Sequence, residues 1–310
     1  MITTADKLNM VVWAFSIFSA LILILVAFSW HRKKKLSLFS IAAILIVLVG
    51  ITSFVDAYWI EPNWLKTEQV VIHDPELAEV LEGIKVVQIS DIHLQGGIGD
   101  RERDLIAQVN ALGPDLLFIT GDFFSDKQKL ELNAEVTALS ELIRSFKTTT
   151  GIFGVPGNYD RPLSDPAIRK KFKAAGIDIL INQNRAVALP NHKILYLAGF
   201  DDSQNRRANL KAFSGIPPSA PVVLLAHDPE NFGEAIGAGV NLLLAGHMHG
   251  GQIGIPFLVR KSRSANKSSF MSGLFDKGKT KMYVNRGIAT THIPIRFLNR
   301  PEITVLAIRK

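Results

Sequence analysis

Cysteine is absent from all 310 residues of this chain. A structural zinc site built on thiolates is therefore excluded, and no disulfide framework indicates the compartment of the protein. The sequence also shows no internal repeat and no low-complexity tract. Its 47% content of hydrophobic residues is enough for one large domain or two small ones with a real core.

Formal charge is absent from two long apolar runs, residues 8–30 and residues 36–55. As a helix, each run is long enough to cross a bilayer about 30 Å thick. The basic residues 31–35 lie between them and suit a tight turn at a membrane surface. We therefore expect residues 1–58 to form a transmembrane helical hairpin with a basic connecting loop.

A cleavable signal peptide is the competing interpretation of the first run. Such a peptide carries basic residues before its apolar stretch and a small-residue cleavage site after it. Here the basic cluster follows the run and only Lys7 precedes it, which favours the hairpin. The positive-inside rule then places the basic loop in the cytoplasm and the rest of the chain on the non-cytoplasmic face of a cell membrane.

The formal net charge is +7, and residues 32–35 supply more than half of it. This excess needs no nucleic-acid partner, and none is expected. A second basic stretch covers residues 260–281. It is either a solvated loop or a contact for anionic lipid or a phosphorylated substrate.

Beyond a juxtamembrane connector at residues 59–83, short aliphatic runs alternate with amphipathic segments. We expect strands at residues 84–90, 116–120, 152–155, 193–200, 222–226, 242–245, 281–285 and 302–308. We expect helices at residues 100–112, 130–146 and 166–175, with Ser164 as a cap before the last and Gly176 after it. This order predicts an α/β domain over residues 84–310, a two-sheet sandwich flanked by helices.

Polar side chains follow the ends of several expected strands. Asp91 and His93 come after the first strand at a spacing of two, which puts both side chains on the same side of an extended chain. The whole set of candidate ligands is Asp91, His93, Asp122, Asn158, His227, His247 and His249. Taken singly, each is more often a turn or core residue, but the ordered series at strand ends is specific for a metal site.

Seven nitrogen and oxygen ligands exceed what one catalytic ion needs. Two divalent ions about 3.5 to 4 Å apart, bridged by one carboxylate, would use them all. The absence of a thiolate favours a hard-to-borderline metal. Gly121, Gly157 and Gly246 precede Asp122, Asn158 and His247, where close backbone approach to such a cluster is required.

This ordered series resembles the calcineurin-like metallophosphoesterases. The family pattern D-x-H, G-D, G-N-H-D/E, H and G-H-x-H is matched at residues 91–93, 121–122, 157–160, 227 and 246–249. The resemblance covers about residue 84 to the C-terminus and implies the metallophosphoesterase fold. It implies that Asp91, His93 and His249 hold one metal, that Asn158, His227 and His247 hold the other, and that Asp122 bridges them. It also implies two divalent ions, with Mn²⁺ first and Fe, Zn or Co as alternatives.

Later segments are similar to a membrane-associated bacterial branch of this family, which includes UDP-2,3-diacylglucosamine pyrophosphatase of lipid A biosynthesis. They are residues 250–253, 283–287, 294–296 and 300–303. This resemblance implies cleavage of a phosphoanhydride in a phosphorylated, lipid-linked substrate at the membrane. A phosphodiesterase or phosphatase acting on nucleotide or cell-envelope substrates is the first alternative, and a non-catalytic metal-binding membrane module is the second. Lipid A precursors are processed on the cytoplasmic face, which conflicts with the side of the membrane expected from the charge pattern.

One residue departs from the family pattern, because Tyr159 stands where the family has histidine. The resemblance places that histidine near the leaving group. Tyrosine, with a pKa of about 10, is a poorer acid near neutral pH, so the change favours a phosphoanhydride or an activated diester over an alkyl monoester. His192 or His292 could replace the missing acid in space.

The expected catalytic residues are Asn158, Tyr159 and Asp160. Asp160 either orients Tyr159 or caps the following turn. Arg161 and Arg296 are expected to bind substrate by neutralising phosphate oxygens during in-line attack of water on phosphorus. The alternative for both is a surface or ion-pair arginine.

Overall fold

The computed structural model describes residues 4–33, 37–125, 132–202, 208–255 and 270–310. The basic residues Lys34, Lys35, Arg260, Lys261, Arg263 and Lys267, which the sequence singled out, lie outside these ranges.

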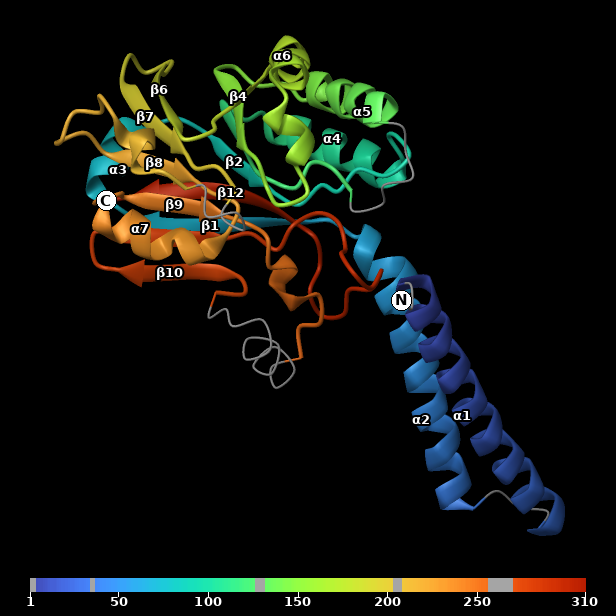
Figure 1. Cartoon of the computed structure of the whole chain (residues 1–310). Coiled ribbons are helices and arrows are strands. Elements are labelled where there is room, and N and C mark those ends of the chain that lie inside the picture. The colour runs from blue at the N-terminus through green and yellow to red at the C-terminus, as the bar shows by residue number, and fades with distance from the viewer. Residues whose placement is uncertain (1–3, 34–36, 126–131, 203–207, 256–269) are drawn as a thin grey trace.

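Two long helices, α1 (Thr4–Lys33) and α2 (Leu38–Val55), lie side by side and project from the rest of the molecule (Figure 1). Ser37 caps α2, because its hydroxyl accepts a hydrogen bond from the Ser40 N–H at 3.1 Å. The helical path continues through η1 (Asp56–Ile60) and η2 (Glu61–Asn63) toward the first strand.

Among the described residues, one helix is long and apolar enough to cross a membrane by length and composition. It is Leu38–Asn63, with a mean hydropathy of 2.7. The apolar helix Ser16–Arg32 is shorter. The described residues thus supply one candidate span, and the expected hairpin of two spans is not confirmed.

The rest of the chain forms two six-stranded mixed sheets. The first has the order β1 (Lys66–His73), β12 (Glu302–Arg309), β2 (Val86–Ile89), β3 (Leu116–Thr120), β4 (Gly151–Val155), β5 (Ile177–Ile179). The second has the order β10 (Gly273–Lys277), β11 (Thr280–Val284), β9 (Leu242–Ala245), β8 (Val222–Leu225), β7 (Ile194–Gly199), β6 (Gln183–Ala188). The helices of this part are α3 (Pro75–Val80), α4 (Asp100–Leu112), α5 (Leu132–Ser145), α6 (Pro166–Ala175) and α7 (Phe232–Gly237).

Apolar side chains fill the space between the sheets and cover their outer faces. Phe118 and Val155 of the first sheet share one cluster with Leu197 and Leu242 of the second. Helices α4, α5 and α6 pack on the outer face of the first sheet, and α7 packs on the second (Figure 1). The central strands β2, β3, β8 and β9 are buried along their whole length, as strands covered on both faces should be. The expected two-sheet sandwich flanked by helices is confirmed.

The domain begins earlier in the chain than residue 84, the boundary expected from the sequence. Strand β1 pairs in parallel with β12 along all eight residues. Ile72 of β1 and Leu77 of α3 are fully buried in the cluster between the sheets. The expected connector at residues 59–83 is therefore largely a strand and a helix of the domain. The sequence did not predict β1, because most of its residues are polar or exposed and its partner strand, β12, lies at the C-terminal end of the chain.

Strands β2, β3 and β4 run parallel to one another, as do β7, β8, β9 and β11. Their carboxyl ends therefore lie along the same edge of each sheet. The buried Gln88 side chain joins the two sheets there, since its amide donates to Thr120 Oγ1 at 3.0 Å and to the Ala245 carbonyl at 2.9 Å. The loops that follow these strands are thereby held close together.

Candidate metal centre and active site

All seven candidate ligands lie in the segments that follow the carboxyl ends of strands, and His249 begins the short 3-10 helix η7 (His249–Gly251). Asp91 and His93 follow β2, Asp122 follows β3, Asn158 follows β4, His227 follows β8, and His247 and His249 follow β9. The structure brings six of them together as two groups of three metal-ligand side chains, with Asn158 beside the second group.

The first group is Asp91, His93 and His249, and all three are buried. One ligand atom from each lies within 4.8 Å of the others. Nε2 of His249 lies 3.2 Å from Oδ1 of Asp91, and the His93 and His249 rings stack with centroids 5.3 Å apart. These three residues could hold one metal ion.

The second group is Asp122, His227 and His247, again within 4.8 Å of one another. Nε2 of His227 lies 3.1 Å from Oδ2 of Asp122 and 3.1 Å from Nδ1 of His247. Oδ1 of Asn158 lies 3.2 Å from the same His227 nitrogen. The amide oxygen of Asn158 is thus placed to complete the second group.

One carboxylate lies between the groups. Oδ2 of Asp122 is 3.1 Å from His227 Nε2 and 3.5 Å from His93 Nε2. A single oxygen therefore contacts a ligand of each group, which is the position that a bridging ligand requires.

The histidine hydrogen bonds fit metal binding. Nδ1 of His93 lies 3.0 Å from the Phe124 carbonyl, Nδ1 of His227 lies 2.8 Å from the Thr120 carbonyl, and Nδ1 of His249 lies 3.1 Å from the Ala289 carbonyl. Because a carbonyl only accepts, each Nδ1 must carry the proton, and Nε2 is left as a lone-pair donor. Nε2 of His93 is buried with no hydrogen-bond partner among the described residues. Buried polar atoms normally have a partner, so this nitrogen is available as a metal ligand.

Five ligand residues have left-handed backbone conformations. Their φ angles are 52° for Asp91, 41° for His93, 54° for Asp122, 71° for His247 and 47° for His249. Non-glycine residues rarely adopt this region, and such strain persists only where the surroundings impose it, most often at functional sites. All five residues lie within four positions of the end of β2, β3 or β9.

Glycines allow the loops to close around these carboxylates. A Cβ on Gly157 would overlap Oδ1 of Asp122, and a Cβ on Gly246 would overlap the Ser90 side chain. The close backbone approach expected at both glycines is therefore present. Gly287, which the sequence did not single out for this role, is equally close, since its Cβ would lie 2.8 Å from that of Asp91.

Charges within the site shift several pKa values in the metal-free protein. Burial alone would lower the pKa of His227, but Asp122, Asp91 and the hydrogen bond to Thr120 together outweigh burial and raise the pKa to about 10. Burial lowers the pKa of His93 to about 4. Burial acts to raise the pKa of Asp91, yet His249, His227 and His93 together outweigh burial and the pKa falls. Cation binding must therefore displace a proton from His227, because only the neutral ring is a ligand.

Asp160 is buried and faces the loop backbone rather than the cavity at the metal site. One carboxylate oxygen accepts from the N–H groups of Phe123 and Phe124 at 2.9 and 3.0 Å, and the other accepts from Gly157 at 2.7 Å. Burial, followed by the nearby Asp122, raises the pKa of Asp160 to about 8. These hydrogen bonds join Asp160 to the loops of Asp122 and Asn158, and Asp160 is not among the residues that line the cavity at the metal site. Its expected catalytic role stays a prediction.

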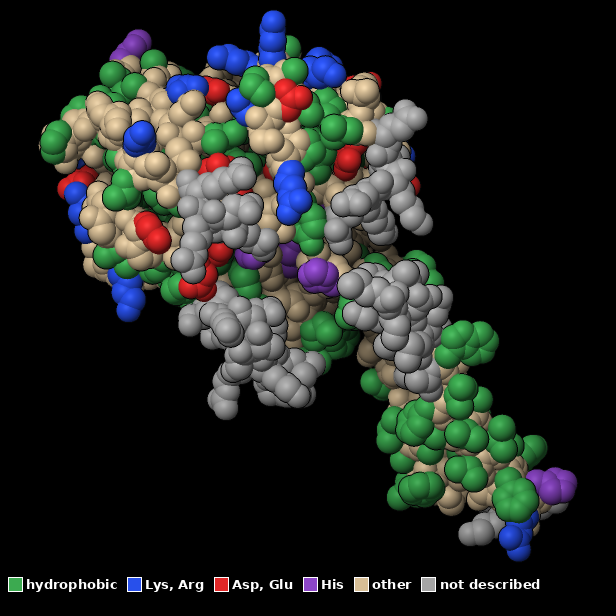
Figure 2. All heavy atoms as spheres, in the orientation of Figure 1, with side chains coloured by type: hydrophobic (Ala, Val, Ile, Leu, Met, Phe, Trp, Pro, Cys, Tyr) green, Lys and Arg blue, Asp and Glu red, His purple; other side chains and the backbone are tan. Residues whose placement is uncertain are grey.

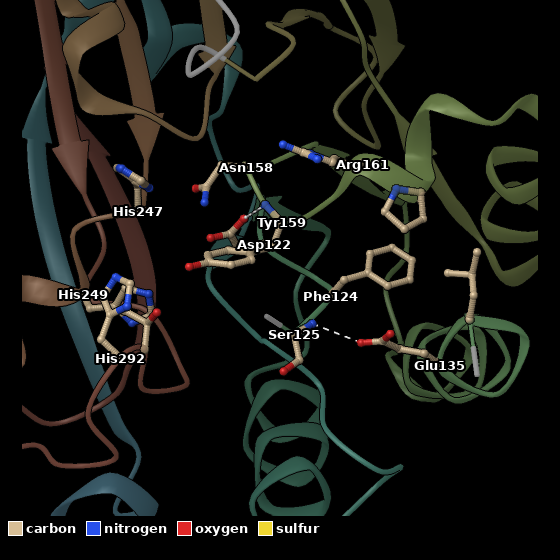
Figure 3. Close-up of a pocket in the computed structure, with 13 residues that line it drawn as sticks. Asp122, Phe124, Ser125, Glu135, Asn158, Tyr159, Arg161, His247, His249 and His292 are labelled. Atoms are coloured by element: carbon tan, nitrogen blue, oxygen red, sulfur yellow. Dashed lines mark hydrogen bonds between the residues drawn. The ribbon is translucent and has the colours of Figure 1, made fainter. Parts of the chain in front are cut away.

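A cavity of about 700 Å³ opens over the two ligand groups. Figure 3 shows His247, His249 and His292 on one wall and Phe124 and Glu135 on the other. The remaining lining residues are Asp122, Ser125, Leu132, Asn158, Tyr159, Arg161, Pro162 and Thr291. Sequence reasoning missed Phe124, Ser125, Leu132, Glu135, Pro162 and Thr291 as cavity residues, because no spacing pattern joins them to the ligands.

Tyr159 lies at the cavity, with its ring edge-to-face against His93 at a centroid distance of 5.0 Å. Its backbone N–H donates to Oδ1 of Asp122 at 3.0 Å. Of the two histidines considered as a replacement acid, His292 lines the cavity. His192 lies in the turn between β6 and β7 and is not among the lining residues.

The two candidate substrate arginines differ in position. Arg161 is exposed and lines the cavity, with its side chain directed toward Asn158 (Figure 3). Arg296 is fully buried and donates to the carbonyls of residues 286, 287, 289 and 299. The position of Arg296 contradicts the expected substrate contact, because its guanidinium is enclosed by backbone acceptors. Through the Ala289 carbonyl, which also accepts from His249, it supports the metal site.

The family model for calcineurin-like phosphoesterases matches residues 84–251. The chain is 30% identical over 305 residues to a "Transmembrane protein with metallophosphoesterase domain" of Bos taurus, covering 91% of this chain and 65% of that protein. It is 30% identical to "Phosphodiesterase YaeI" of Escherichia coli, covering 72% of this chain and 81% of that protein. It is 26% identical to "UDP-2,3-diacylglucosamine pyrophosphatase LpxG" of Chlamydia muridarum, covering 84% of this chain and 94% of that protein.

The matched segment contains every ligand of the two groups and most of both sheets. Family, relatives and site geometry agree, which sets aside a non-catalytic metal-binding module. The chain belongs to the calcineurin-like phosphoesterase family and is a metal-dependent phosphoesterase.

Proposed function

We propose that this chain is a membrane-anchored, two-metal phosphohydrolase that cleaves phosphoanhydride or phosphodiester bonds, with UDP-2,3-diacylglucosamine pyrophosphatase as the leading candidate activity. The observation that carries this proposal is the Asp122 carboxylate, which contacts both ligand groups at the cavity. A phosphorylated substrate fits there because Arg161 adds positive charge to the same cavity.

In this proposal Asp91, His93 and His249 would hold one ion, Asn158, His227 and His247 would hold the other, and Asp122 would be shared by both. When bound, the ions supply charge neutralisation for the phosphate oxygens and an activated water. Their N and O donors, without thiolate, suit Mn²⁺, and Fe, Zn or Co are the alternatives.

The other cavity residues act on the substrate. Arg161 binds phosphate oxygens, and the Tyr159 hydroxyl donates a hydrogen bond to the leaving group. Asp160 holds the loops of Asp122 and Asn158 in position through its hydrogen bonds to their backbone N–H groups. A phosphoanhydride expels a phosphate that is already a good leaving group, so it depends least on a strong acid at residue 159.

The name of LpxG and its 94% coverage support the pyrophosphatase candidate. A phosphodiesterase is the second candidate, and the name of YaeI supports it. Purified full-length protein with Mn²⁺ should hydrolyse UDP-2,3-diacylglucosamine faster than bis(p-nitrophenyl) phosphate. Turnover of the diester alone would favour the second candidate, and no turnover of either would contradict the proposal.

Membrane anchoring is supported by Leu38–Asn63, by its neighbour α1 and by the name of the Bos taurus relative. We propose that α1 and α2 both span, with Arg32 and Lys33 at the cytoplasmic end and the domain on the non-cytoplasmic face. The leading candidate activity needs a cytoplasmic domain, so this topology and that substrate exclude each other. A reporter fused after Lys310 tests this directly. A non-cytoplasmic reporter supports this topology and favours cell-envelope substrates, whereas a cytoplasmic reporter contradicts it and favours a lipid A precursor.

A further inference from the structure

The end of the projecting helix is fastened to a loop of the domain. The Arg296 N–H donates to the Ala57 carbonyl at 2.9 Å. The buried Glu61 carboxylate accepts from the Leu298 N–H at 2.7 Å and also from the Asn299 N–H. The loop therefore has a fixed position beside the helix end.

Large apolar side chains are exposed on both sides of this junction. They are Ile293 (42% exposed), Ile60 (48%), Trp64 (56%), Trp59 (57%) and Leu298 (66%). Figure 2 shows hydrophobic side chains along the projecting helices outside the domain. These five residues, called the junction surface below, belong to the end of the helical path and to the domain loop fastened to it.

Leu298 is unusual in its backbone as well as its exposure. Its φ is 54°, a left-handed conformation that glycine or asparagine adopts more easily than leucine. The loop needs this conformation, because the N–H groups of Leu298 and Asn299 both reach Glu61. Yet the leucine side chain points to solvent, so packing inside the domain does not explain it.

We propose that the junction surface docks on the headgroup region of the same bilayer that helix Leu38–Asn63 crosses, and this rests on the membrane anchoring proposed above. Continuity with the apolar helix identifies the occupant, because Trp59 and Ile60 belong to its last turns. Tryptophan is enriched where a span meets the headgroups.

Arg300 adds a positive charge beside the junction surface, opposite in sign to the lipid phosphates. Its guanidinium lies 3.6 Å from the centroid of the Trp64 ring, and its Nε donates to the Trp64 carbonyl at 3.1 Å. An arginine beside an interfacial tryptophan suits the phosphates of lipid headgroups.

The junction surface is joined to the active site. Gln252 accepts from the Thr291 N–H at 2.6 Å and donates to the Ile293 carbonyl at 2.9 Å, which fixes the segment that carries cavity residues Thr291 and His292. On the other side, Asn299 Nδ2 donates to the His249 carbonyl at 2.9 Å. Docking would therefore hold the cavity close to the headgroups, where the phosphate of an amphiphilic substrate lies.

The absence of cysteine makes a site-directed test direct. Single-cysteine variants Leu298→Cys and Ile293→Cys of the full chain would be labelled with an NBD fluorophore and placed in vesicles of phosphatidylethanolamine and phosphatidylglycerol. Leu210→Cys is the matched control, since Leu210 is 61% exposed and lies in η5 (Leu210–Phe213) beside β6 and β7, at the end of the domain away from α2. Ile46→Cys reports on the middle of α2.

Docking predicts a blue-shifted emission at Leu298 and Ile293, quenched at least about twofold by headgroup-level nitroxide lipids, with Leu210 remaining aqueous. A blue-shifted emission at Ile46 but not at Leu298 and Ile293 would overturn the docking while leaving the anchor intact. An aqueous signal at Ile46 as well would overturn both the anchor and the docking. Equal quenching at Leu210 would also overturn it, because the contact would then not be specific to this surface.

Discussion

Oδ2 of Asp122 lies 3.1 Å from Nε2 of His227, and both side chains are buried. In the metal-free protein this contact is an ion pair, since the carboxylate raises the pKa of the imidazole. With a cation bound, the same two atoms become ligands. The protonation of His227 and the binding of a metal ion at this pair therefore exclude each other.

Metal binding should release a proton from His227. The pKa of His227 is raised to about 10, so the ring is charged at every pH below that value and must lose its proton to bind a cation. Metal affinity should rise by about tenfold per pH unit between pH 7 and pH 9. Titration calorimetry in buffers of different ionisation enthalpy measures the released protons, and a pH-independent affinity would contradict this link.

Substitution Gly157→Ala should inactivate the enzyme. The new Cβ would overlap Oδ1 of Asp122, so the carboxylate must move from between the two ligand groups. We expect a fall in kcat of about 100-fold or more, as for other disturbed metal ligands. Gly237→Ala is the matched control, because a Cβ at that position of α7 meets nothing within 4 Å. Equal kcat values for the two variants would show that this close approach is unimportant.

The side chain at residue 159 should determine how strongly the rate of hydrolysis depends on the leaving group. Tyr159→His restores a stronger acid near neutral pH, so hydrolysis of alkyl phosphate monoesters should rise by about 10-fold to 100-fold. Hydrolysis of p-nitrophenyl esters, whose leaving group needs no proton, should change by less than about threefold. The ratio of the two rates in wild type, Tyr159→His and Tyr159→Phe measures this effect. An unchanged ratio in Tyr159→His would remove the proposed role.

Substitution of Arg161 should affect substrate binding, whereas substitution of Arg296 should affect the stability of the fold. Arg161→Ala should raise KM by about tenfold with an unchanged Tm, because the side chain is exposed at the cavity. Arg296→Met should lower the free energy of unfolding by about 2 to 4 kcal/mol, because it leaves buried carbonyls without donors. Kinetics and thermal unfolding of both variants check this division. A raised KM with unchanged stability in Arg296→Met would restore its expected contact with substrate.

Elements with a strong local pattern could be predicted from the sequence. The bounds of α4, α6, β3 and β9 agree with expectation, because each is an amphipathic helix or a short apolar run buried on both faces. Gly176 does follow the last residue of α6, and its backbone is left-handed. Its cap is Asp165 rather than Ser164, since the Asp165 carboxylate accepts from the Ala167 N–H at 2.8 Å.

Elements that depend on distant partners could not be predicted. Strand β1 has an exposed, polar pattern and pairs with β12 at the other end of the chain. Strands β5 and β6 and the short helices α3 and α7 were likewise missed. Each is short or partly exposed, so its sequence carries little periodicity.

The candidate ligands could be named from the sequence because each one comes shortly after a strand that the sequence predicts. Their left-handed backbone angles could not, and neither could the close approach of Gly287 to Asp91. These features arise only when loops from both sheets meet. The burial of Arg296 is of the same kind, since an arginine near the C-terminus gives no sign of the carbonyls that surround it.

Metal analysis of the purified full-length protein, with Asp122→Asn beside it, tests the two-ion site most directly. The exposed Asp276→Asn is the matched control. We expect about two divalent ions per chain in wild type and Asp276→Asn, and at least one ion lost with hydrolysis reduced about 100-fold or more in Asp122→Asn. Wild-type protein without stoichiometric divalent metal, or an Asp122→Asn variant that keeps both ions and full activity, would contradict the proposed centre.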